Sequence, residues 1–160
     1  MQNPSNRPLL VLVGACATVA LLAACASLGS PKDQQSASLL WQKIDGHRQW
    51  GFFDSHVGIE DGHGPHGKFV ATFLSASAHA NQAKPPFGSI LVKENYTKND
   101  ASALDSFTVM QRIEGYDPEN GDWFWARFTP AGKLTHSGKV AMCFDCHFDA
   151  DGDDFVFLND

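Results

Sequence analysis

The sequence predicts an α+β fold in which an antiparallel β-sheet forms most of the structure and a few short helices complete it. Four segments are apolar and β-prone, or alternate between apolar and polar residues, at positions 68–75, 89–94, 107–114 and 123–129. Residues 117–121 (DPENG) between the last two are strong turn formers, so these two segments are expected to form a hairpin. Helical character is confined to 38–44, 75–82 and a short turn near the C-terminus.

The N-terminal segment is predicted to be an export signal. Residues 9–22 are apolar, a run too short to span a bilayer comfortably but typical of a signal-peptide core. The run ends in LAAC, which resembles a bacterial lipobox and predicts a lipoprotein signal peptide over 1–24 with lipidation of Cys25. Ordinary signal cleavage nearby is the alternative. Ala26 favours the outer membrane, so the mature protein is expected on the periplasmic side of a Gram-negative envelope, held there by lipid.

The chain from Cys25 onward is divided into two segments. Residues 25–38 are small and polar, and they are expected to form a flexible tether. Residues 39–160 are expected to form one domain that is large enough to bury a modest core. The chain carries a formal net charge of −6, which suits neither nucleic acid nor an anionic lipid surface.

Residues 143–147 (CFDCH) match the C-x-x-C-H signal for covalent attachment of haem c. Two thiols along one turn can each add to a haem vinyl group, and the adjacent His147 then lies under the ring as an iron ligand. A zinc site would need a second pair of ligands, and a thioredoxin-like pair would lie inside a βαβ unit. One covalent haem c held by Cys143, Cys146 and His147 is therefore expected.

The other iron ligand is not supplied by a methionine after the motif, because no Met follows His147. The position opposite His147 is expected to be open or occupied by water, which suits the chemistry of small ligands. If an internal ligand exists, Met110 and His79 are the first candidates.

Several segments together resemble the cytochrome P-460 family. They are residues 65–67 (PHG), 88–95 (GSILVKEN), 115–126 (GYDPENGDWFWA), 138–141 (GKVA), the haem motif, and 154–157 (DFVF). The resemblance covers most of the chain from about residue 50 onward.

This resemblance implies an antiparallel sheet packed against one five-coordinate haem c, in a chain that is usually a homodimer. It also implies one of two activities. Cytochrome P-460 itself oxidises hydroxylamine and carries a lysine cross-linked to its haem, whereas cytochrome c′-β lacks the cross-link and binds nitric oxide in a pocket capped by phenylalanines.

Two residue types bear on the choice between these activities. Lys84 is the only lysine on the segment before the 89–94 strand, where the cross-linking lysine is expected, but it lies a few residues too close to the strand. The pocket carboxylate of the oxidases is expected shortly before the haem motif, where residues 135–139 contain none. Binding of nitric oxide or single-electron transfer with a periplasmic redox partner is therefore favoured. A hydroxylamine or nitric oxide oxidoreductase is the alternative, so the enzyme class stays open.

Phenylalanines and histidines supply the remaining candidates. Phe69, Phe73 and Phe87 are hypothesised to form a distal wall, with Phe69 and Phe73 on one face of their strand, although ordinary core packing is the alternative for each. His56, His63 and His66 lie in a glycine-rich segment that is a weaker candidate for zinc or copper. Lys93 and Glu94 are expected to form a solvated ion pair at the end of their strand.

Overall fold

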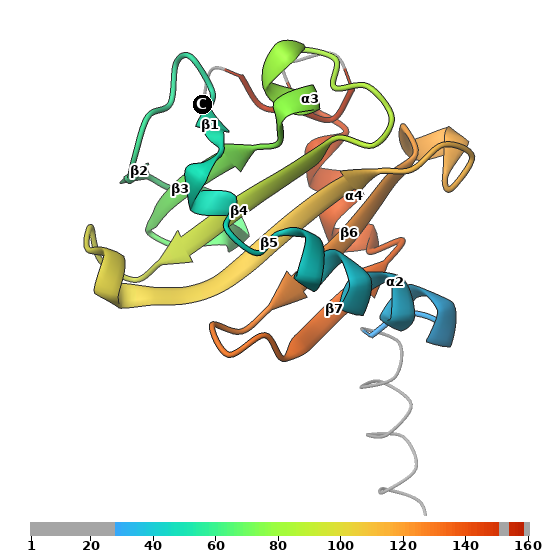
Figure 1. Ribbon diagram of the computed structural model, residues 1–160, viewed down its shortest axis with the longest axis horizontal. Helices are drawn as coiled ribbons and strands as arrows, with labels where there is room; N and C mark the ends of the chain where they lie inside the picture. The colour runs from blue at the N-terminus through green and yellow to red at the C-terminus, as the bar shows by residue number, and fades with distance from the viewer. Residues whose placement is uncertain (1–27, 151–153, 159–160) are drawn as a thin grey trace, which may run out of the picture.

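The computed structural model describes residues 28–150 and 154–158, and it consists of a seven-stranded antiparallel sheet with helices on both faces (Figure 1). The strands run in the order β1-β3-β4-β5-β6-β7, and β2 pairs with the other end of β3. They are β1 (Gly51–Phe52), β2 (Glu60–Asp61), β3 (Phe69–Leu74), β4 (Ile90–Tyr96), β5 (Leu104–Arg112), β6 (Trp123–Phe128) and β7 (Leu134–Gly138). This architecture confirms the predicted α+β fold.

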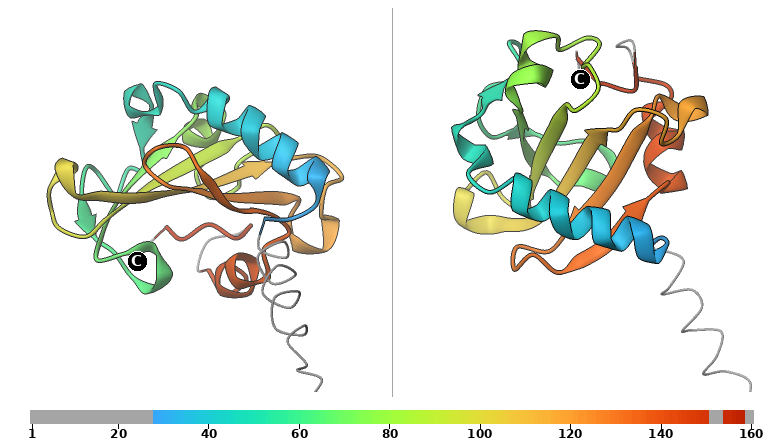
Figure 2. Two further views of the ribbon diagram at one scale, coloured as in Figure 1. Left: turned by 90° about the horizontal axis from the view of Figure 1, so that it is seen from below. Right: turned by 45° about the vertical axis from the view of Figure 1, so that its right-hand side comes forward.

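Short helices connect and cover the strands. Within the described residues the α-helices are α2 (Pro31–Lys43), α3 (Ala76–Ala80) and α4 (Ala141–His147), and the 3₁₀ turns are η1 (His47–Gln49), η2 (Gly64–His66), η3 (Ala101–Ala103) and η4 (Pro118–Asn120). Figure 2 shows α2 on one face of the sheet and α4 on the opposite face. None of the helices in the described ranges is long and apolar enough to cross a membrane.

The four segments predicted as strands form β3, β4, β5 and β6, and the predicted hairpin joins β5 to β6. Its turn contains η4 and ends at Gly121, whose φ of 67° is easily reached by glycine. Residues 134–138 were not predicted as a strand, because LTHSG is short and has no apolar alternation. They form β7 by pairing with β6 and contribute to the edge of the sheet next to α4.

Helix α2 corrects one prediction. Residues 31–38 were expected in a flexible tether, but the helix begins at Pro31. Ser30 and Asp33 form a reciprocal capping box, in which each side chain accepts a hydrogen bond from the other residue's backbone N–H, and proline is well suited to the first helical position. Tyr116 donates a 2.8 Å hydrogen bond to Asp33, so the helix start is also fixed to the domain. The predicted signal peptide and Cys25 lie outside the described residues.

Alternate residues of the central strands pack on opposite faces of the sheet. The face under α2 is apolar, and its Phe73, Val92 and Phe124 share one buried cluster with Leu40 of the helix and Ile44 at the helix end. The opposite face forms a second cluster with the C-terminal part of the chain, and it includes Leu91, Met110, Trp123, Trp125 and Val156. The sheet therefore separates a closed core beneath α2 from the face on which α4 lies.

A buried acid stabilises the α2 face. Glu94 on β4 is 1% exposed, and it accepts hydrogen bonds from Arg48 (2.8 Å) and from the Tyr96 hydroxyl, while His47 Nε2 lies 2.8 Å from its carboxylate. Burial raises the pKa of Glu94, but these hydrogen bonds outweigh it and the pKa falls to about 2. The expected solvated pair with Lys93 is wrong, because β4 continues to Tyr96 and the two side chains point to opposite faces.

We predict that Glu94→Gln lowers the free energy of unfolding of the holoprotein by about 2–4 kcal/mol at pH 7, because it weakens buried charge-assisted hydrogen bonds. A carboxylate with a depressed pKa stabilises the fold above its ordinary pKa of 4.5, and this contribution is lost as the pH falls toward about 2. Urea unfolding of both proteins should therefore converge at low pH. The exposed control Glu119→Gln should leave the unfolding midpoint unchanged, and an equal loss in both variants would contradict the prediction.

Candidate functional site

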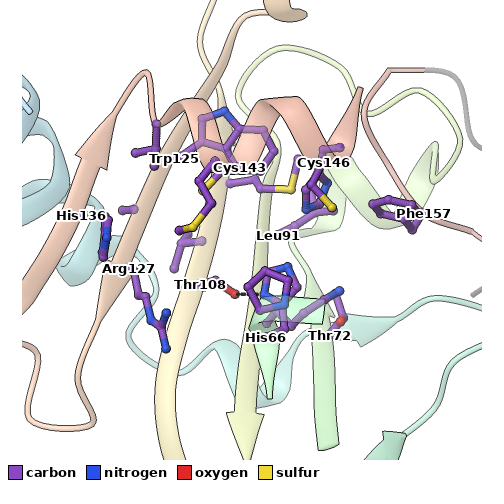
Figure 3. A pocket seen from close by; sticks show the side chains of 18 of the residues that line it. His66, Thr72, Leu91, Thr108, Trp125, Arg127, His136, Cys143, Cys146 and Phe157 are labelled. Carbon is purple, nitrogen blue, oxygen red and sulfur yellow. Dashed lines mark hydrogen bonds between the residues drawn. The ribbon is translucent and has the colours of Figure 1, made fainter. Parts of the chain in front are cut away.

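A cavity lies between the sheet and α4, on the face opposite α2. The space between its atoms amounts to about 870 Å³, part of it open to solvent. Its walls come from the sheet, from α4, from η2 and from the C-terminal segment 154–158 (Figure 3). We call it the α4 cavity.

The floor of the α4 cavity contains a polar row and an apolar row. The polar row crosses five paired strands, and its members are Thr72, Lys93, Thr108, Arg127 and His136. The apolar row lies two residues along the same strands, and its cavity-lining members are Leu91, Met110 and Trp125. The floor is therefore apolar on one side and carries two cationic side chains, Lys93 and Arg127, on the other.

Helix α4 brings the predicted attachment residues to this cavity. Cys143, Cys146 and His147 all line it, and the two thiols are free rather than joined in a disulfide. Cys143 is half-buried and Cys146 is exposed. Burial raises the pKa of the Cys143 thiol to about 11, despite the nearby charge of Arg127. The helix therefore presents two thiols and one imidazole to the same space.

His147 is held by the end of the chain. It is 7% exposed, its Nδ1 lies 2.9 Å from the Phe155 carbonyl oxygen, and its ring packs on Trp125 (4.8 Å between centroids) and Phe157 (5.0 Å). When Nδ1 carries the proton and donates to that carbonyl, Nε2 is left as a lone-pair donor, which is the usual arrangement of a metal-binding histidine. Burial lowers the pKa of His147 to about 4, although the hydrogen bond to Phe155 opposes this.

Arg112 and Asp154 hold the segment that supplies the Phe155 carbonyl. Arg112 donates two hydrogen bonds to the Asp154 carboxylate, one of them 3.0 Å long, and a third of 2.7 Å to the Pro85 carbonyl. Trp123 Nε1 donates to the Asp154 carbonyl at 2.9 Å. Asp154 and Phe155 both have positive φ, a strained conformation that this network maintains.

The wall opposite α4 comes from η2. His66 Nδ1 lies 3.1 Å from the Thr108 hydroxyl, and the His66 ring lies 6.0 Å from the His147 ring between centroids. Figure 3 shows His66 and Thr108 facing the α4 cysteines across the cavity. Burial and the nearby charge of Lys93 lower the pKa of His66 to about 3, so both imidazoles are neutral.

A family model described as Cytochrome P460 matches residues 44–158, well over half of the chain. The chain belongs to the cytochrome P460 family. This match confirms the resemblance drawn from the sequence, and the chain is therefore a haem-binding cytochrome. A comparison with curated proteins finds no match.

The α4 cavity fits a haem on its own chemistry. Its sulfur and imidazole donors are those of a haem c site, and its walls are largely apolar. Trp125 Nε1 is buried with no hydrogen-bond partner among the described residues, an unsatisfied donor that a polar atom of a bound group would satisfy. Cys143, Cys146 and His147 would hold the haem in this P460 domain, and Lys93 and Arg127 would neutralise its carboxylates.

The phenylalanines predicted to form the distal wall, Phe69, Phe73 and Phe87, do not line the cavity. Phe69 and Phe73 do share a face, as expected, but it is the α2 face, where Phe73 is 6% exposed and packs beside His47. Phe87 is 50% exposed and lies against the Arg112 guanidinium, outside the cavity lining. Phe53 and Phe157 are the phenylalanines that line the cavity.

The lysine of the cavity is Lys93, not Lys84. Lys84 is exposed on the α3–β4 connection and does not line the cavity. Lys93 lies on the cavity face of β4, one residue from the buried Glu94, and its charge lowers the pKa values of both His66 and His147. Strand parity could have identified it, because Lys93 alternates with Val92 and Glu94 on the opposite face.

The three histidines of the glycine-rich segment, His56, His63 and His66, do not lie together in the structure. His66 lines the cavity, whereas His56 binds Glu60 and the Leu158 carbonyl, and His63 is exposed. Across residues 28–150 and 154–158, no group of three or more His, Cys, Asp or Glu side chains could hold a metal ion. His79, a candidate ligand from the sequence, is exposed on α3 and outside the cavity lining, while Met110 belongs to the floor.

We predict that Asp154→Asn lowers the free energy of unfolding of the holoprotein by about 1–3 kcal/mol, because it weakens the two-point contact with a largely buried guanidinium. Urea unfolding monitored by near-ultraviolet circular dichroism measures the change. Asp145→Asn removes an equal charge from an exposed position on α4 and should have little effect. Wild-type stability in Asp154→Asn would show that the ion pair does not anchor the segment.

Proposed function

We propose that this P460 cytochrome carries one haem c, bonded to Cys143 and Cys146 with His147 as an axial ligand, and that it binds nitric oxide and exchanges single electrons rather than oxidising hydroxylamine. The observation that carries the proposal is the composition of the α4 cavity. Its described lining has histidine, lysine, arginine and threonine as its polar side chains besides the two thiols, and contains no Asp or Glu.

The lack of a carboxylate bears directly on the reaction. Oxidation of hydroxylamine releases protons as well as electrons, so an oxidase needs a group near the substrate that accepts protons. The neutral histidines of the cavity are poor acceptors, because burial lowers their pKa values. Nitric oxide binding needs no proton transfer, and a cavity of this composition is compatible with it.

Two features support the covalent part of the proposal. Cys143 and Cys146 are three residues apart on α4, so their side chains lie on neighbouring positions of one helix face with His147 beside them. Both thiols are free. Haem is attached to such motifs outside the cytoplasm, which supports export as part of the same proposal. The proposed lipidation of Cys25 and the location on the periplasmic side of the outer membrane rest on the LAAC sequence and on Ala26. A homodimer and a periplasmic redox partner are expected from the family.

One observation favours the oxidase as the second candidate. The resemblance implies a lysine bonded to the porphyrin, and Lys93 is the lysine that the structure brings to the cavity. If the chain is a hydroxylamine oxidase, Lys93 forms that bond, because Lys84 lies outside the cavity. The two candidates therefore differ in a covalent bond that can be measured.

We predict that the ferrous holoprotein has an ordinary haem c spectrum, that it binds nitric oxide, and that it does not oxidise hydroxylamine with an artificial electron acceptor. Intact mass, peptide mapping and the absorption spectrum are compared for the wild type, Lys93→Arg and the control Lys84→Arg. A peptide joining residues around Lys93 to the haem, together with hydroxylamine turnover that Lys93→Arg abolishes, would replace the proposal with the oxidase.

We predict that Cys143→Ala and Cys146→Ala each retain haem through one remaining thioether, with the pyridine haemochrome band shifted to longer wavelength. The double variant should lose its haem on acid–acetone extraction, because an imidazole bond alone does not survive acid. Asp145→Ala in the same helix, exposed and outside the cavity lining, is the matched control and should behave as the wild type. Haem that is extracted from the wild type would refute covalent attachment.

A further inference from the structure

The C-terminal segment 154–158 is held at both of its ends. Asp154, at the first end, is bound by arginine and tryptophan side chains of the sheet. At the other end the Leu158 carbonyl oxygen lies 3.1 Å from His56 Nε2 and accepts a 3.0 Å hydrogen bond from the Ser55 hydroxyl. The segment is therefore tied to the rest of the domain on either side of its centre.

The centre of the segment contacts the proposed iron ligand. The Phe155 carbonyl oxygen lies 2.9 Å from His147 Nδ1, and the Phe157 ring packs on the imidazole with 5.0 Å between centroids. Val156 between them is 2% exposed and belongs to the cluster on the cavity face of the sheet. The orientation of His147 therefore depends on where the segment lies, and the contacts at both ends contribute to that position.

His56 extends from a tight turn that begins at Phe53. The backbone N–H of His56 donates to the Phe53 carbonyl at 3.2 Å, and Asp54 and Ser55 occupy the two central positions, which both residue types favour. Phe53 is buried and lines the α4 cavity, so the turn is packed against the domain. The imidazole therefore reaches the C-terminal segment from a fixed backbone.

The two contacts of the His56 ring require both of its nitrogens to carry hydrogen. Nε2 faces the Leu158 carbonyl at 3.1 Å, and Nδ1 faces the Glu60 carboxylate at 2.9 Å. Carbonyl and ionised carboxylate oxygens only accept hydrogen bonds, whereas a neutral imidazole has a single N–H. A neutral ring would direct a lone pair at one of the two oxygens, while the imidazolium donates to both. The geometry therefore favours the protonated ring.

Glu60 is the charged side chain that contacts this imidazole. It comes from β2 and its side chain is 31% exposed, whereas the His56 side chain is 15% exposed. The C-terminal segment presents a carbonyl oxygen to the ring, and the turn presents the Phe53 ring, 6.4 Å away between centroids. Asp54 on the same turn is exposed to solvent. The protonation of His56 is therefore coupled to one carboxylate and one carbonyl.

We propose that protonated His56 is a positioning residue for the haem: it holds residues 154–158 against His147, and it releases their end when it loses its proton. The positioning role rests on the proposed function, in which His147 binds the iron, whereas the hold on the segment does not. As the pH rises through the range in which histidines change charge, about pH 5–8, the ring keeps one N–H. That proton stays on Nδ1, because a carboxylate accepts a stronger hydrogen bond than a carbonyl. Nε2 then directs a lone pair at the Leu158 carbonyl, and the contact is lost.

Chymotrypsin cleavage of the holoprotein after Phe155 and Phe157 measures release of the segment, because proteolysis follows the population of the opened form. Each rate is divided by that of an unstructured peptide of the same sequence at the same pH. The wild-type ratio should rise about fivefold or more between about pH 6 and 8.5, since a charge-assisted hydrogen bond is lost. His63→Gln, which alters an exposed histidine of the same glycine-rich segment, should show the same rise. A wild-type ratio that does not change with pH would overturn the proposal.

Two variants test the role of the proton. His56→Gln should give the high ratio at every pH, because the change removes the titrating group. Glu60→Gln should give the low ratio throughout, because its amide can donate to Nδ1 and leave the N–H of a neutral ring for the Leu158 carbonyl. A Glu60→Gln protein that keeps the wild-type rise would overturn the proposal, even if His56→Gln does not fold.

Resonance Raman spectra of the ferrous holoprotein test the positioning role separately. The frequency of the iron–histidine stretch reports the strength of the hydrogen bond from His147 Nδ1, because that bond makes the imidazole a stronger ligand. The frequency should fall in the wild type over the pH range in which cleavage rises, and it should stay constant in Glu60→Gln. A constant wild-type frequency would overturn the positioning role but not the hold on the segment. If no iron–histidine band is found, ligation by His147 fails and the positioning role fails with it, while the cleavage results still decide the hold.

Discussion

The side chains of a β-strand alternate between its two faces, and this period of two decides which residues can meet in the α4 cavity. On β4, Lys93 reaches the cavity while its neighbour Glu94 is buried with His47, Arg48 and Tyr96 beneath α2. The same alternation places Thr108 and Arg127 in the polar row and gives the α2 face an apolar core. A shift of one residue in the register of β4 would bury Lys93 in that core and expose Glu94 to the cavity, so the Glu94 hydrogen bonds also fix the chemistry of the opposite face.

The two walls of the cavity are assembled in different ways. The wall formed by η2 comes from residues close together in sequence, because η2 lies between β2 and β3, which pair directly. The wall opposite η2, which we call the proximal wall, combines α4 with residues 154–158. These residues are held to the sheet by Arg112 and by Trp123. Both walls end in an imidazole with a hydrogen-bonded Nδ1, one on a backbone carbonyl and one on a hydroxyl.

Much of the fold and the attachment turn could be predicted from sequence, since they depend on local patterns. Alternation and turn residues identified β3 to β6, and the spacing of Cys143, Cys146 and His147 identified the residues that the structure places on one helix. The residues of the cavity opposite α4 could not be predicted in the same way, because they depend on which face of each strand packs toward α4 and which packs toward α2. Phe69 and Phe73 have correct mutual parity, but their own sequence does not say which face receives the haem. His66 was assigned to a loop with His56 and His63, and its place in the cavity depends on contacts with Thr108 and His147, which are distant in sequence.

The hydrogen bond from His147 to Phe155 has a consequence for the order in which the protein is assembled. The strands from β3 to β7 end at residue 138, and the attachment turn follows at once, whereas the carbonyl that orients His147 lies in the last residues of the chain. The sheet can therefore form before the proximal wall is complete, while Cys146 is still at the surface. Residues 154–158 therefore affect the orientation of the imidazole without being needed for the pairing of the strands.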